Sequence, residues 1–313
     1  MIIKANDIQE ELMHGYRHGK KRATTTHIPE VDKAWRWREG DLTIWTGYQN
    51  EGKSLFLEQL MALKSALEGW THCIFSPENT PATDYFDNII EMLVGKSCDP
   101  FYEGNLMSES QYLNAIQFVN KHFYLTLPDG QWSVEAIHTD FEQAIRDFKI
   151  KNLVYDPYNK IMHDMGNERG DIYVSNFMTT IKRFAVKHQV SSNLVAHQLT
   201  AQKDEQGRYV KPDLNRIKGG GAFSDGADHV CYVWRPDRAT DFSSTLVQMG
   251  SQKIKKQKLV AIPSDVYGIG FSRKKNRYSY NGRDPFEKVD RMRLFEKSTE
   301  YKPNSLNKFR ILE

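Results

Sequence analysis

Residues 47–54 read Gly-Tyr-Gln-Asn-Glu-Gly-Lys-Ser and follow the pattern GxxxxGKS. The apolar run 42–46 precedes this stretch, and a helical pattern over 55–63 follows it. A loop of this composition between a strand and a helix is the context that identifies a phosphate-binding loop, or P-loop. Its two glycines let the backbone curl so that successive N–H groups face inward, and the helix N-terminus adds partial positive charge. The stretch therefore predicts a nucleoside triphosphate site.

Lys53 and Ser54 are the P-loop residues with the most specific expected roles. Lys53 is expected to reach the β- and γ-phosphates, and the Ser54 hydroxyl is expected to hold Mg²⁺. We expect ATP with Mg²⁺ as the cofactor, and the sequence leaves another triphosphate open. The other nucleotide-binding candidates are the remaining loop positions and the residue after them: Gly47, Asn50, Glu51, Gly52 and Leu55.

The composition is that of a globular chain without membrane segments. Of its 313 residues, 39% are hydrophobic and 27% are charged. No apolar run approaches the ~20 residues that span a bilayer, and residues 1–6 lack the core of a signal peptide. The three cysteines are far apart and lack metal-ligand spacing, which favours a reducing compartment. We therefore expect a cytoplasmic protein.

Strand and helix patterns alternate over most of the chain. Apolar runs predict strands at 42–46, 72–76, 122–126, 152–156, 191–196, 229–234, 245–249 and 267–272. Because helices separate most of the early strands, we expect an α/β fold with a mainly parallel, twisted sheet flanked by helices. The last two strands follow each other directly and should form a C-terminal antiparallel hairpin. The expected divisions are an N-terminal helix with its linker, the α/β core, and a polar, loosely ordered tail: residues 1–27, 28–283 and 284–313.

Residues 7–18 have the pattern of an amphipathic helix. Ile8, Leu12 and Tyr16 fall on one stripe, and a polar linker, residues 19–26, separates this helix from the core. An apolar stripe of this kind has to be buried against another surface. A neighbouring subunit and the chain's own core are the two alternatives at this point.

Acidic and polar side chains follow three of the predicted strands, where an open parallel sheet binds its ligands. Glu78 could polarise a water molecule, or be a surface residue at a helix start. Asp156 ends a buried strand, and a carboxylate there is unfavourable unless it is paired with a cation. This is the Walker B arrangement. His197 and Gln198 end a third strand, where they could sense the γ-phosphate or be structural.

A long polar loop, residues 200–221, follows that strand and ends in three glycines. Loops of this length are usually functional or disordered. Cations on such a loop suit a nucleic-acid backbone, because that binding is electrostatic, and a merely solvated loop is the alternative. The candidate DNA-binding residues are Arg208, Lys211, Arg216, Lys218 and Gly219.

From Trp35 to about Asn281 the chain resembles the helicase domain of the DnaB/Twinkle class of hexameric replicative helicases. The most specific similarity is the run from Gly207 to Arg235, which resembles the family's DNA-binding loop and the helix and strand after it. The other segments that carry the resemblance are 37–54, Phe75-Ser76-Pro77-Glu78, Asp156-Pro157-Tyr158-Asn159 and Ala196-His197-Gln198-Leu199.

The resemblance implies a RecA-like core in a ring that moves 5′ to 3′ along single-stranded DNA, with nucleotide at the subunit interfaces. Glu78 matches the family's catalytic glutamate and Asp156 the Walker B acid. Gln198, or His197 beside it, matches the sensor that couples to the DNA loop. The resemblance also places Arg235 near the nucleotide base with Phe271 on the opposing face, and it assigns the helix at 7–18 to docking on the adjacent subunit.

One departure concerns the cation that the family supplies to the neighbouring subunit, usually from a Lys-x-Arg sequence. By order, that place is taken by Lys253-Ile254-Lys255, which has no arginine. Lysine lacks the bidentate fork of arginine, so this replacement could weaken catalysis. Lys275-Asn276-Arg277 has the right letters but lies in the apparent turn after the last hairpin strand. We favour Lys253 and Lys255, with Arg277 as the alternative and solvated hairpin charge as a further one.

The resulting hypothesis is an ATP-dependent replicative DNA helicase that works as a ring, with a hexamer expected. A recombinase-like ATPase on the same core and a ring subunit that binds ATP but hydrolyses it poorly are the two alternatives. We expect single-stranded or forked DNA as a partner. We expect either a helicase alone or one piece of a split primase-helicase, so a separate primase or polymerase is a further candidate partner. The expected host is a bacterial or phage-infected cell, with an organelle as the alternative.

Overall fold

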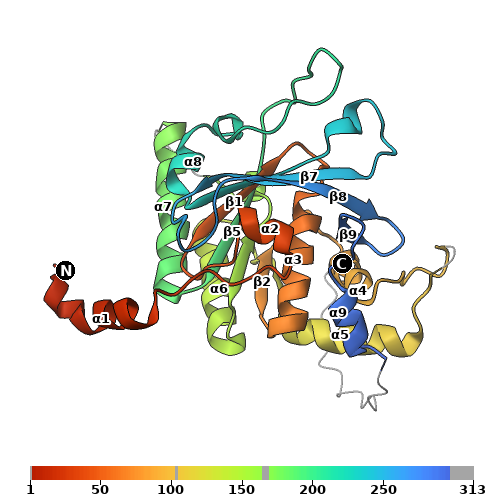
Figure 1. Cartoon of the computed structure of the whole chain (residues 1–313), viewed down its shortest axis with the longest axis horizontal. Helices are drawn as coiled ribbons and strands as arrows, with labels where there is room; N and C mark the ends of the chain where they lie inside the picture. The colour runs from red at the N-terminus through yellow and green to blue at the C-terminus, as the bar shows by residue number, and fades with distance from the viewer. Residues whose placement is uncertain (1, 103–104, 164–168, 297–313) are drawn as a thin grey trace.

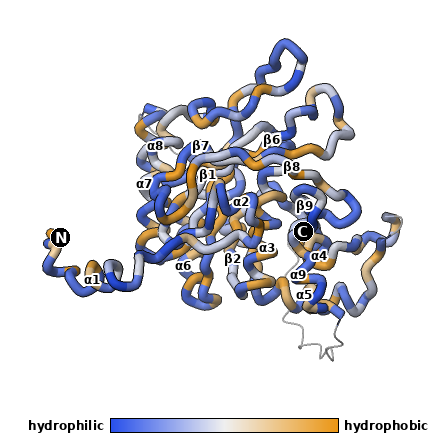
Figure 2. The backbone as a smooth tube through the Cα atoms, viewed as in Figure 1, coloured by the Kyte–Doolittle hydropathy of each residue, from blue (hydrophilic) through white to orange (hydrophobic). Residues whose placement is uncertain are grey.

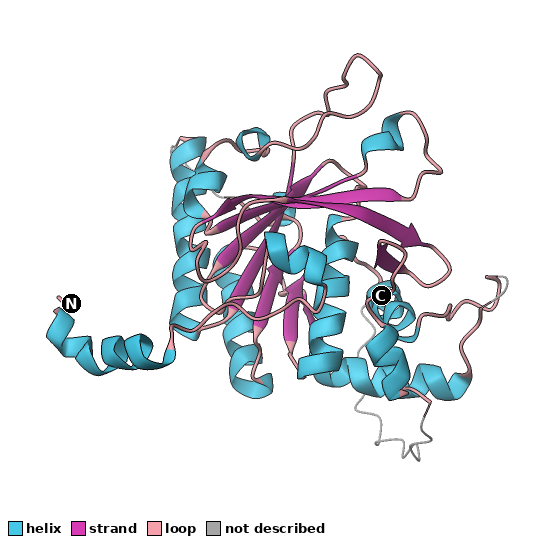
Figure 3. Cartoon of the chain, viewed as in Figure 1, coloured by secondary structure: helices cyan, strands magenta, loops and turns pink. Residues whose placement is uncertain are grey.

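The computed structural model describes residues 2–102, 105–163 and 169–296, which fold around a nine-stranded twisted sheet (Figures 1 and 3). The strand order is β3-β2-β4-β5-β1-β6-β7-β8-β9. Pairing is parallel from β3 to β6 and antiparallel from β6 to β9. The strands are β1 Leu42–Gly47, β2 His72–Phe75, β3 Phe123–Thr126, β4 Asn152–Tyr155, β5 Ser191–His197, β6 His229–Trp234, β7 Leu246–Ile254, β8 Asp265–Ser272 and β9 Arg277–Tyr280.

The α/β fold class and the mainly parallel sheet are confirmed. The antiparallel part is larger than a single hairpin, because β7 continues to Ile254 and a further short strand, β9, pairs with β8. The sequence pattern did not predict β9. Its outer edge is closed by a side chain, since the Gln59 amide accepts from the Tyr278 N–H and donates to the Tyr278 carbonyl.

Helices cover both faces of the sheet (Figure 3). One apolar core includes residues of α3, α4 and α5, and the other includes residues of α6, α7 and α8. In Figure 2 the long segment after β5 is mostly hydrophilic. The helices are α1 Gln9–His18, α2 Pro29–Ala34, α3 Lys53–Glu68, α4 Ala82–Val94, α5 Glu109–His122, α6 Val134–Phe148, α7 Gly170–His188, α8 Ala222–Gly226 and α9 Glu287–Met292. No described helix is both long and apolar enough to cross a membrane.

The N-terminal helix α1 stands clear of the folded body (Figure 1). None of its residues is buried, and Leu12 and Tyr16 expose 51% and 84% of their surface. Of the two alternatives for the apolar stripe, packing on the chain's own core is therefore not adopted. The expected linker ends earlier than residue 26, because Ala23 and Thr26 are buried in the core.

Residues 284–296 correct the expectation of a loosely ordered tail. They include α9, and Phe286, Val289 and Phe295 are all buried against the main core. Burial of these three apolar side chains offsets the conformational entropy that the segment loses when it is ordered. The overall polar composition of the segment masked this contribution. The rest of the expected tail, residues 297–313, lies outside the described residues.

The parallel strands end together at one edge of the sheet. Gly47 at the end of β1 is in register with His197 at the end of β5. Phe75 of β2 pairs with Tyr155 of β4, which in turn pairs with Leu194. The segments that follow these strands, and all the acidic and polar candidates on them, therefore converge on this edge.

Candidate active site

The P-loop joins β1 to α3 in a conformation that depends on its glycines. Gly47 has φ +151°, and a Cβ there would lie 2.3 Å from the Val233 carbonyl oxygen of β6. Gly52 has φ +83°, and a Cβ there would lie 2.3 Å from the Tyr278 hydroxyl. Because a side chain at either position meets a neighbouring atom, the close approach of the loop to β6 and β9 requires glycine.

Lys53 is buried at the start of α3 and is held inside the loop. Its Nζ donates to the Tyr48 carbonyl at 2.7 Å. Burial lowers the pKa of this ammonium to about 8, although the nearby carboxylates of Asp156, Glu51 and Glu78 oppose the shift. The ammonium is therefore desolvated and surrounded by negative charge, which is the setting expected for a cation that binds phosphate.

Asp156 and Ser54 lie together at the expected metal site. Burial raises the pKa of Asp156 to about 6, while the nearby Ser54 hydroxyl and Lys53 ammonium act in the opposite direction. A buried carboxylate with so little compensation is a fitting ligand for a divalent cation. No cluster of three or more acidic, histidine or cysteine ligands occurs among the described residues. One carboxylate and one hydroxyl suit Mg²⁺, which takes its other ligands from water and phosphate.

Glu78 follows β2 at the same edge of the sheet. Its side chain is 46% exposed, and one oxygen lies 3.5 Å from Nζ of Lys160. Its charge contributes to the raised pKa of Asp156 and opposes the lowered pKa of Lys53. Glu78 thus acts electrostatically on the metal and phosphate candidates and remains accessible to water.

Gln198 connects the end of β1 with the loop at 200–221. Its side-chain amide donates to the Thr46 hydroxyl at 3.0 Å and to the Asp213 carbonyl at 2.9 Å, and it accepts from the Asp213 N–H at 3.3 Å. The His197 carbonyl accepts from the Lys218 N–H at 2.8 Å, but its ring Nδ1 has no hydrogen-bond partner within the described part of the chain. Burial lowers the pKa of the His197 ring to about 4, which keeps it neutral. Of the two sensor candidates, Gln198 has the contacts that a coupling residue needs.

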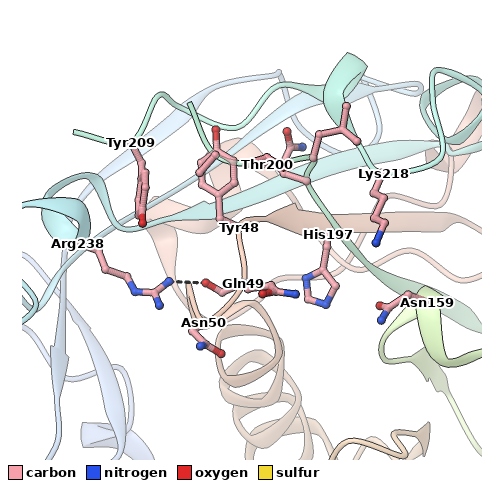
Figure 4. A pocket seen from close by; sticks show the side chains of 12 residues that line it. Tyr48, Gln49, Asn50, Asn159, His197, Thr200, Tyr209, Lys218 and Arg238 are labelled. Atoms are coloured by element: carbon pink, nitrogen blue, oxygen red, sulfur yellow. Dashed lines mark hydrogen bonds between the residues drawn. The ribbon is translucent and has the colours of Figure 1, made fainter. Parts of the chain in front are cut away.

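A polar cavity of about 470 Å³ opens between the P-loop and this loop (Figure 4). Gln49 and Asn50 line it on the P-loop side, and His197 and Lys218 line it on the other. Arg238, which follows β6, donates to the Gln49 carbonyl at its margin (Figure 4). The cavity therefore joins the phosphate-binding backbone to the cations of the long loop.

The cations of the loop differ in how free they are. Arg208 lies 3.9 Å from Asp237, and Lys211 forms a 2.6 Å ion pair with Asp265. Arg216 donates to Gln202. Within the described residues, Lys218 is the member of the four whose side chain has no hydrogen bond or ion pair, and it faces the cavity. Gly219 sits beside it with φ +118°, and a Cβ there would lie 2.4 Å from the Phe223 ring.

A second cavity, of about 220 Å³, lies on the other side of the P-loop. It is lined by Gly52 and Leu55 together with Arg235, Phe271 and Tyr278. The Phe271 and Tyr278 rings are 5.0 Å apart, and the Arg235 guanidinium donates to the Ser244 carbonyl at 2.8 Å. The structure thus brings together the two residues that the family resemblance placed around a nucleotide base.

Glu51 has a different environment from the other P-loop candidates. It is fully buried, and it accepts from the Arg235 backbone N–H and, at 3.4 Å, from Nη1 of Arg238. Its carboxylate therefore holds the loop against the segment after β6, and this places the side chain away from the role of a direct phosphate ligand. Burial raises its pKa, and the two arginines oppose that shift.

The three candidates for a cation donated to a neighbour lie in different surroundings. Lys253 pairs with Val230 near the start of β6, at the opposite edge of the sheet, and its Nζ donates to the Ser224 carbonyl at 2.6 Å. Lys255 is 61% exposed and lies 3.5 Å from Asp228. Arg277 begins β9 rather than lying in a turn, and it is buried with only 2% exposed. Its contacts lie within its own chain, which does not fit a side chain that reaches another subunit.

The comparisons with known proteins agree with this geometry. No protein-family model matches the chain. Over 275 residues it is 27% identical to the Twinkle homolog protein, chloroplastic/mitochondrial, of Arabidopsis thaliana; the match covers 84% of this chain and 37% of that protein. A solved structure described as the ATPase domain of G40P has a TM-score of 0.72 at 13% identity, covering 89% of this chain and 99% of that one. A DnaB-like replicative helicase, described with its interactions with primase, has a TM-score of 0.69 at 14% identity, covering 88% and 68%.

These matches support a DnaB/Twinkle-type helicase domain. The fold is that of the RecA-like ATPase domains of DnaB-like helicases, as the sequence resemblance led us to expect. The chain spans about a third of the length of the curated relative that it matches.

Several residues at this site were not singled out from the sequence. Tyr278 and Arg238 contact the P-loop from segments that follow it by more than 180 residues, so no local pattern could show them. Glu58 is one turn after Ser54 on α3, and burial raises its pKa to about 8. Tyr48 lies in the P-loop itself, at a position that the motif leaves undefined.

Proposed function

We propose that the chain is an ATP-dependent replicative DNA helicase that forms a ring and moves 5′ to 3′ along single-stranded DNA. The observation that carries the proposal is the position of Gln198. Its one side chain touches Thr46, at the root of the P-loop, and Asp213, in the predicted DNA-binding loop. A change at the nucleotide has a short, hydrogen-bonded route to the residues that would hold DNA.

The chemistry follows from the residues at the carboxyl edge of the sheet. The P-loop amides and Lys53 bind the phosphates, and Ser54 with Asp156 would hold Mg²⁺, which neutralises charge on the phosphates when it is bound. Glu78 accepts a hydrogen bond from a water molecule and orients it toward the γ-phosphorus. The water attacks phosphorus, the bond to the β–γ bridging oxygen breaks, and ADP and inorganic phosphate leave. Positioning and electrostatics supply most of the rate enhancement in such reactions.

The 220 Å³ cavity is the proposed site of the base. Phe271 and Tyr278 provide aromatic surface, and the Arg235 guanidinium lies beside it. A planar base suits such a cavity, because aromatic and guanidinium groups both stack on π-faces. We propose ATP as the nucleotide.

Ring assembly has a candidate contact on the surface. An apolar groove of about 330 Å³ lies between α4 and α5, and its lining includes Phe86, Ile90 and Ile116. The exposed stripe of α1, with Leu12 and Tyr16, finds no partner surface within the described part of its own chain. We propose that α1 of one copy docks in the α4–α5 groove of the next, because each surface supplies the apolar cover that the other lacks.

The cation for the neighbouring site is proposed to come from Lys253 or Lys255. Both lie on or next to β7, and Lys255 is the more exposed of the two. Arg277 is the weaker candidate, since its guanidinium is buried in its own subunit. We also propose a separate primase or polymerase as a partner, in a bacterial or phage-infected cell or an organelle.

ATP turnover by the full chain, measured with and without single-stranded DNA, tests the proposal. Single-stranded DNA is expected to raise turnover, and forks with only a 5′ tail are expected to be unwound in preference to forks with only a 3′ tail. Lys218→Ala should reduce the stimulation, whereas Lys274→Ala, on the exposed β8–β9 turn, is the matched control. A turnover rate that ignores DNA would contradict the proposal.

A recombinase-like ATPase remains the second candidate, because the RecA-like fold is shared by proteins that bind DNA without unwinding it. DNA-stimulated turnover with no unwinding of either fork would favour it. Glu78→Gln separates the helicase and the recombinase-like ATPase from a ring subunit that binds ATP without hydrolysing it. In such a ring subunit the substitution would leave ATP turnover unchanged.

A further inference from the structure

Tyr48, the second residue of the P-loop, makes direct contact with the long loop. Its hydroxyl donates to the Val210 carbonyl at 2.9 Å. Its ring lies 5.6 Å from that of Tyr209, at an interplanar angle of 50°. Figure 4 shows both rings at the rim of the polar cavity, near the Gln49–Asn50 backbone. Tyr48 is buried, with 8% of its surface exposed.

The part of the loop that Tyr48 touches is ordered as a small hairpin. Lys203 and Tyr209 form an antiparallel bridge, and the Val210 N–H donates to the Gln202 carbonyl at 2.9 Å. The Asp204 N–H closes the turn by donating to the Arg208 carbonyl at 2.9 Å. This hairpin, residues 202–210, projects beyond the sheet as the teal segment of Figure 1. Because its two sides are bonded to each other, a displacement at Tyr209 moves the whole hairpin.

The other attachments of the long loop reach different places. Gln198 holds Asp213, and Lys211 is paired with Asp265 on β8. These contacts lie after the hairpin and tie the returning strand of the loop to the sheet. Among the described residues, the hairpin has two further side-chain ties: Arg208 lies 3.9 Å from Asp237, and Gln202 accepts a hydrogen bond from Arg216. Tyr48 is therefore the direct connection from the P-loop to the hairpin among the described residues.

The Tyr48 backbone is in turn connected to the phosphate-binding lysine. Nζ of Lys53 donates to the Tyr48 carbonyl at 2.7 Å. A nucleotide phosphate that binds this ammonium competes with the Tyr48 carbonyl for it. Binding of a phosphate in the P-loop therefore acts on Tyr48, whose side chain contacts the hairpin.

We propose that Tyr48 is a positioning residue that transmits occupation of the P-loop to the hairpin 202–210, by a route separate from Gln198. The interpretation of the hairpin as part of a DNA-binding surface rests on the proposed function. The transmission itself needs no DNA and can be measured without it. Allosteric couplings of this kind typically correspond to about 5- to 150-fold changes in an equilibrium.

Limited trypsin digestion reports on the hairpin directly. Lys203 and Arg208 are cleavage sites within it, whereas Lys211 is followed by Pro212 and resists cleavage. The full chain is digested with Mg²⁺ alone, with saturating ADP, and with a saturating non-hydrolysable ATP analogue. We expect the two nucleotide states to change the initial cleavage rate at these sites by at least about 5-fold.

Four variants make the measurement specific. Tyr48→Ala is expected to remove most of the nucleotide-dependent change, and Tyr48→Phe, which keeps the ring but not the hydroxyl, is expected to remove part of it. Tyr209→Ala, outside the P-loop, should act like Tyr48→Ala while a fluorescent nucleotide still binds with wild-type affinity. Tyr124→Phe, on β3, the end strand of the sheet, removes a hydroxyl hydrogen bond to the Lys121 carbonyl and serves as the control.

The result that overturns the inference is a full nucleotide-dependent change in Tyr48→Ala and Tyr209→Ala. A wild-type chain that binds nucleotide without any change in cleavage also overturns it. These outcomes are distinct from failure of the proposed function. If nucleotide changes cleavage of the hairpin but DNA does not stimulate ATP turnover, the Tyr48 coupling is supported and the proposed helicase function is rejected.

Discussion

Arg277 offers a sharp test, because the structure and the family pattern give it different roles. The pattern Lys275-Asn276-Arg277 makes it a candidate to reach a neighbouring nucleotide. In the structure its five N–H donors match five contacts: the carbonyls of Met92 and Leu93 at 2.6 and 2.9 Å, and carboxylate oxygens of Asp284 and Asp290 at 3.0 to 3.1 Å. The guanidinium also lies 4.3 Å from the Phe286 ring centroid. Contacts this complete predict a structural role for Arg277.

The substitution Arg277→Gln should therefore destabilise the isolated chain. Removing one partner of a buried ion pair costs about 3–5 kcal/mol, because the remaining charges stay buried without compensation. Asp290 is partly exposed and can recover some hydration, so the lower part of this range is expected. With an unfolding entropy of about 2 cal/mol/K per residue, the loss corresponds to a fall in Tm of about 5–8 °C.

Thermal and urea unfolding of the two chains provide the measurement, with Arg273→Gln as the matched control. Arg273 lies on the same hairpin but is exposed, and its replacement should change stability by no more than about 0.5 kcal/mol. The reasoning is refuted if Arg277→Gln unfolds like the wild type and yet loses ATP turnover. That pair of results would assign the arginine to a neighbouring active site.

Three further outcomes follow from the geometry. Gly52→Ala should reduce nucleotide affinity and stability together, because its Cβ would lie 2.3 Å from the Tyr278 hydroxyl; titration with a fluorescent nucleotide alongside thermal unfolding checks it, and unchanged affinity would contradict it. Glu78→Gln should slow turnover about 100- to 10,000-fold while the Tm stays within error, since this side chain is nearly half exposed; a wild-type rate would exclude its catalytic role. Acid should destabilise the fold as pH falls from about 6.5 toward 3, because burial lowers the pKa of His72 to about 3 and only the unfolded chain takes up this proton; His72→Gln should flatten the pH dependence of urea unfolding, and an unaltered slope would count against this cause.

The candidate residues at the carboxyl edge of the sheet could be found from the sequence because their signals are local. The P-loop, Asp156 and Gln198 each lie at or just after the end of a strong apolar strand, and strand ends converge in a parallel sheet. The P-loop motif consists of eight consecutive residues, so its local sequence is enough to predict its conformation. Such features need no knowledge of distant contacts.

The C-terminal part was harder to predict because its order depends on distant partners. Strand β9 has four residues between two polar turns, and its free edge is satisfied by Gln59, which lies 219 residues away in the chain. Arg277 looks like a surface cation until the α4 carbonyls that it binds are known. The helical spacing of Phe286 and Val289 was a local signal for α9 that could have been used.

The sensor pair illustrates what sequence reasoning leaves open. His197 and Gln198 are adjacent, and either could be aligned with the family's sensor. Their neighbours decide between them, since Gln198 reaches both Thr46 and Asp213 whereas His197 faces the cavity as a neutral ring. Only the backbone of the returning loop, fifteen residues later, makes this distinction.

The central claim is that the P-loop binds a nucleoside triphosphate through its amides and Lys53. Titration of wild-type and Lys53→Ala chains with a fluorescent ATP analogue and Mg²⁺ tests it most directly, with Lys274→Ala as the control. Loss of one charged hydrogen bond is worth about 1.5–3 kcal/mol, which predicts about 10- to 150-fold weaker nucleotide binding for Lys53→Ala. The affinity of the control should be unchanged. Equal affinities in all three chains would contradict the account.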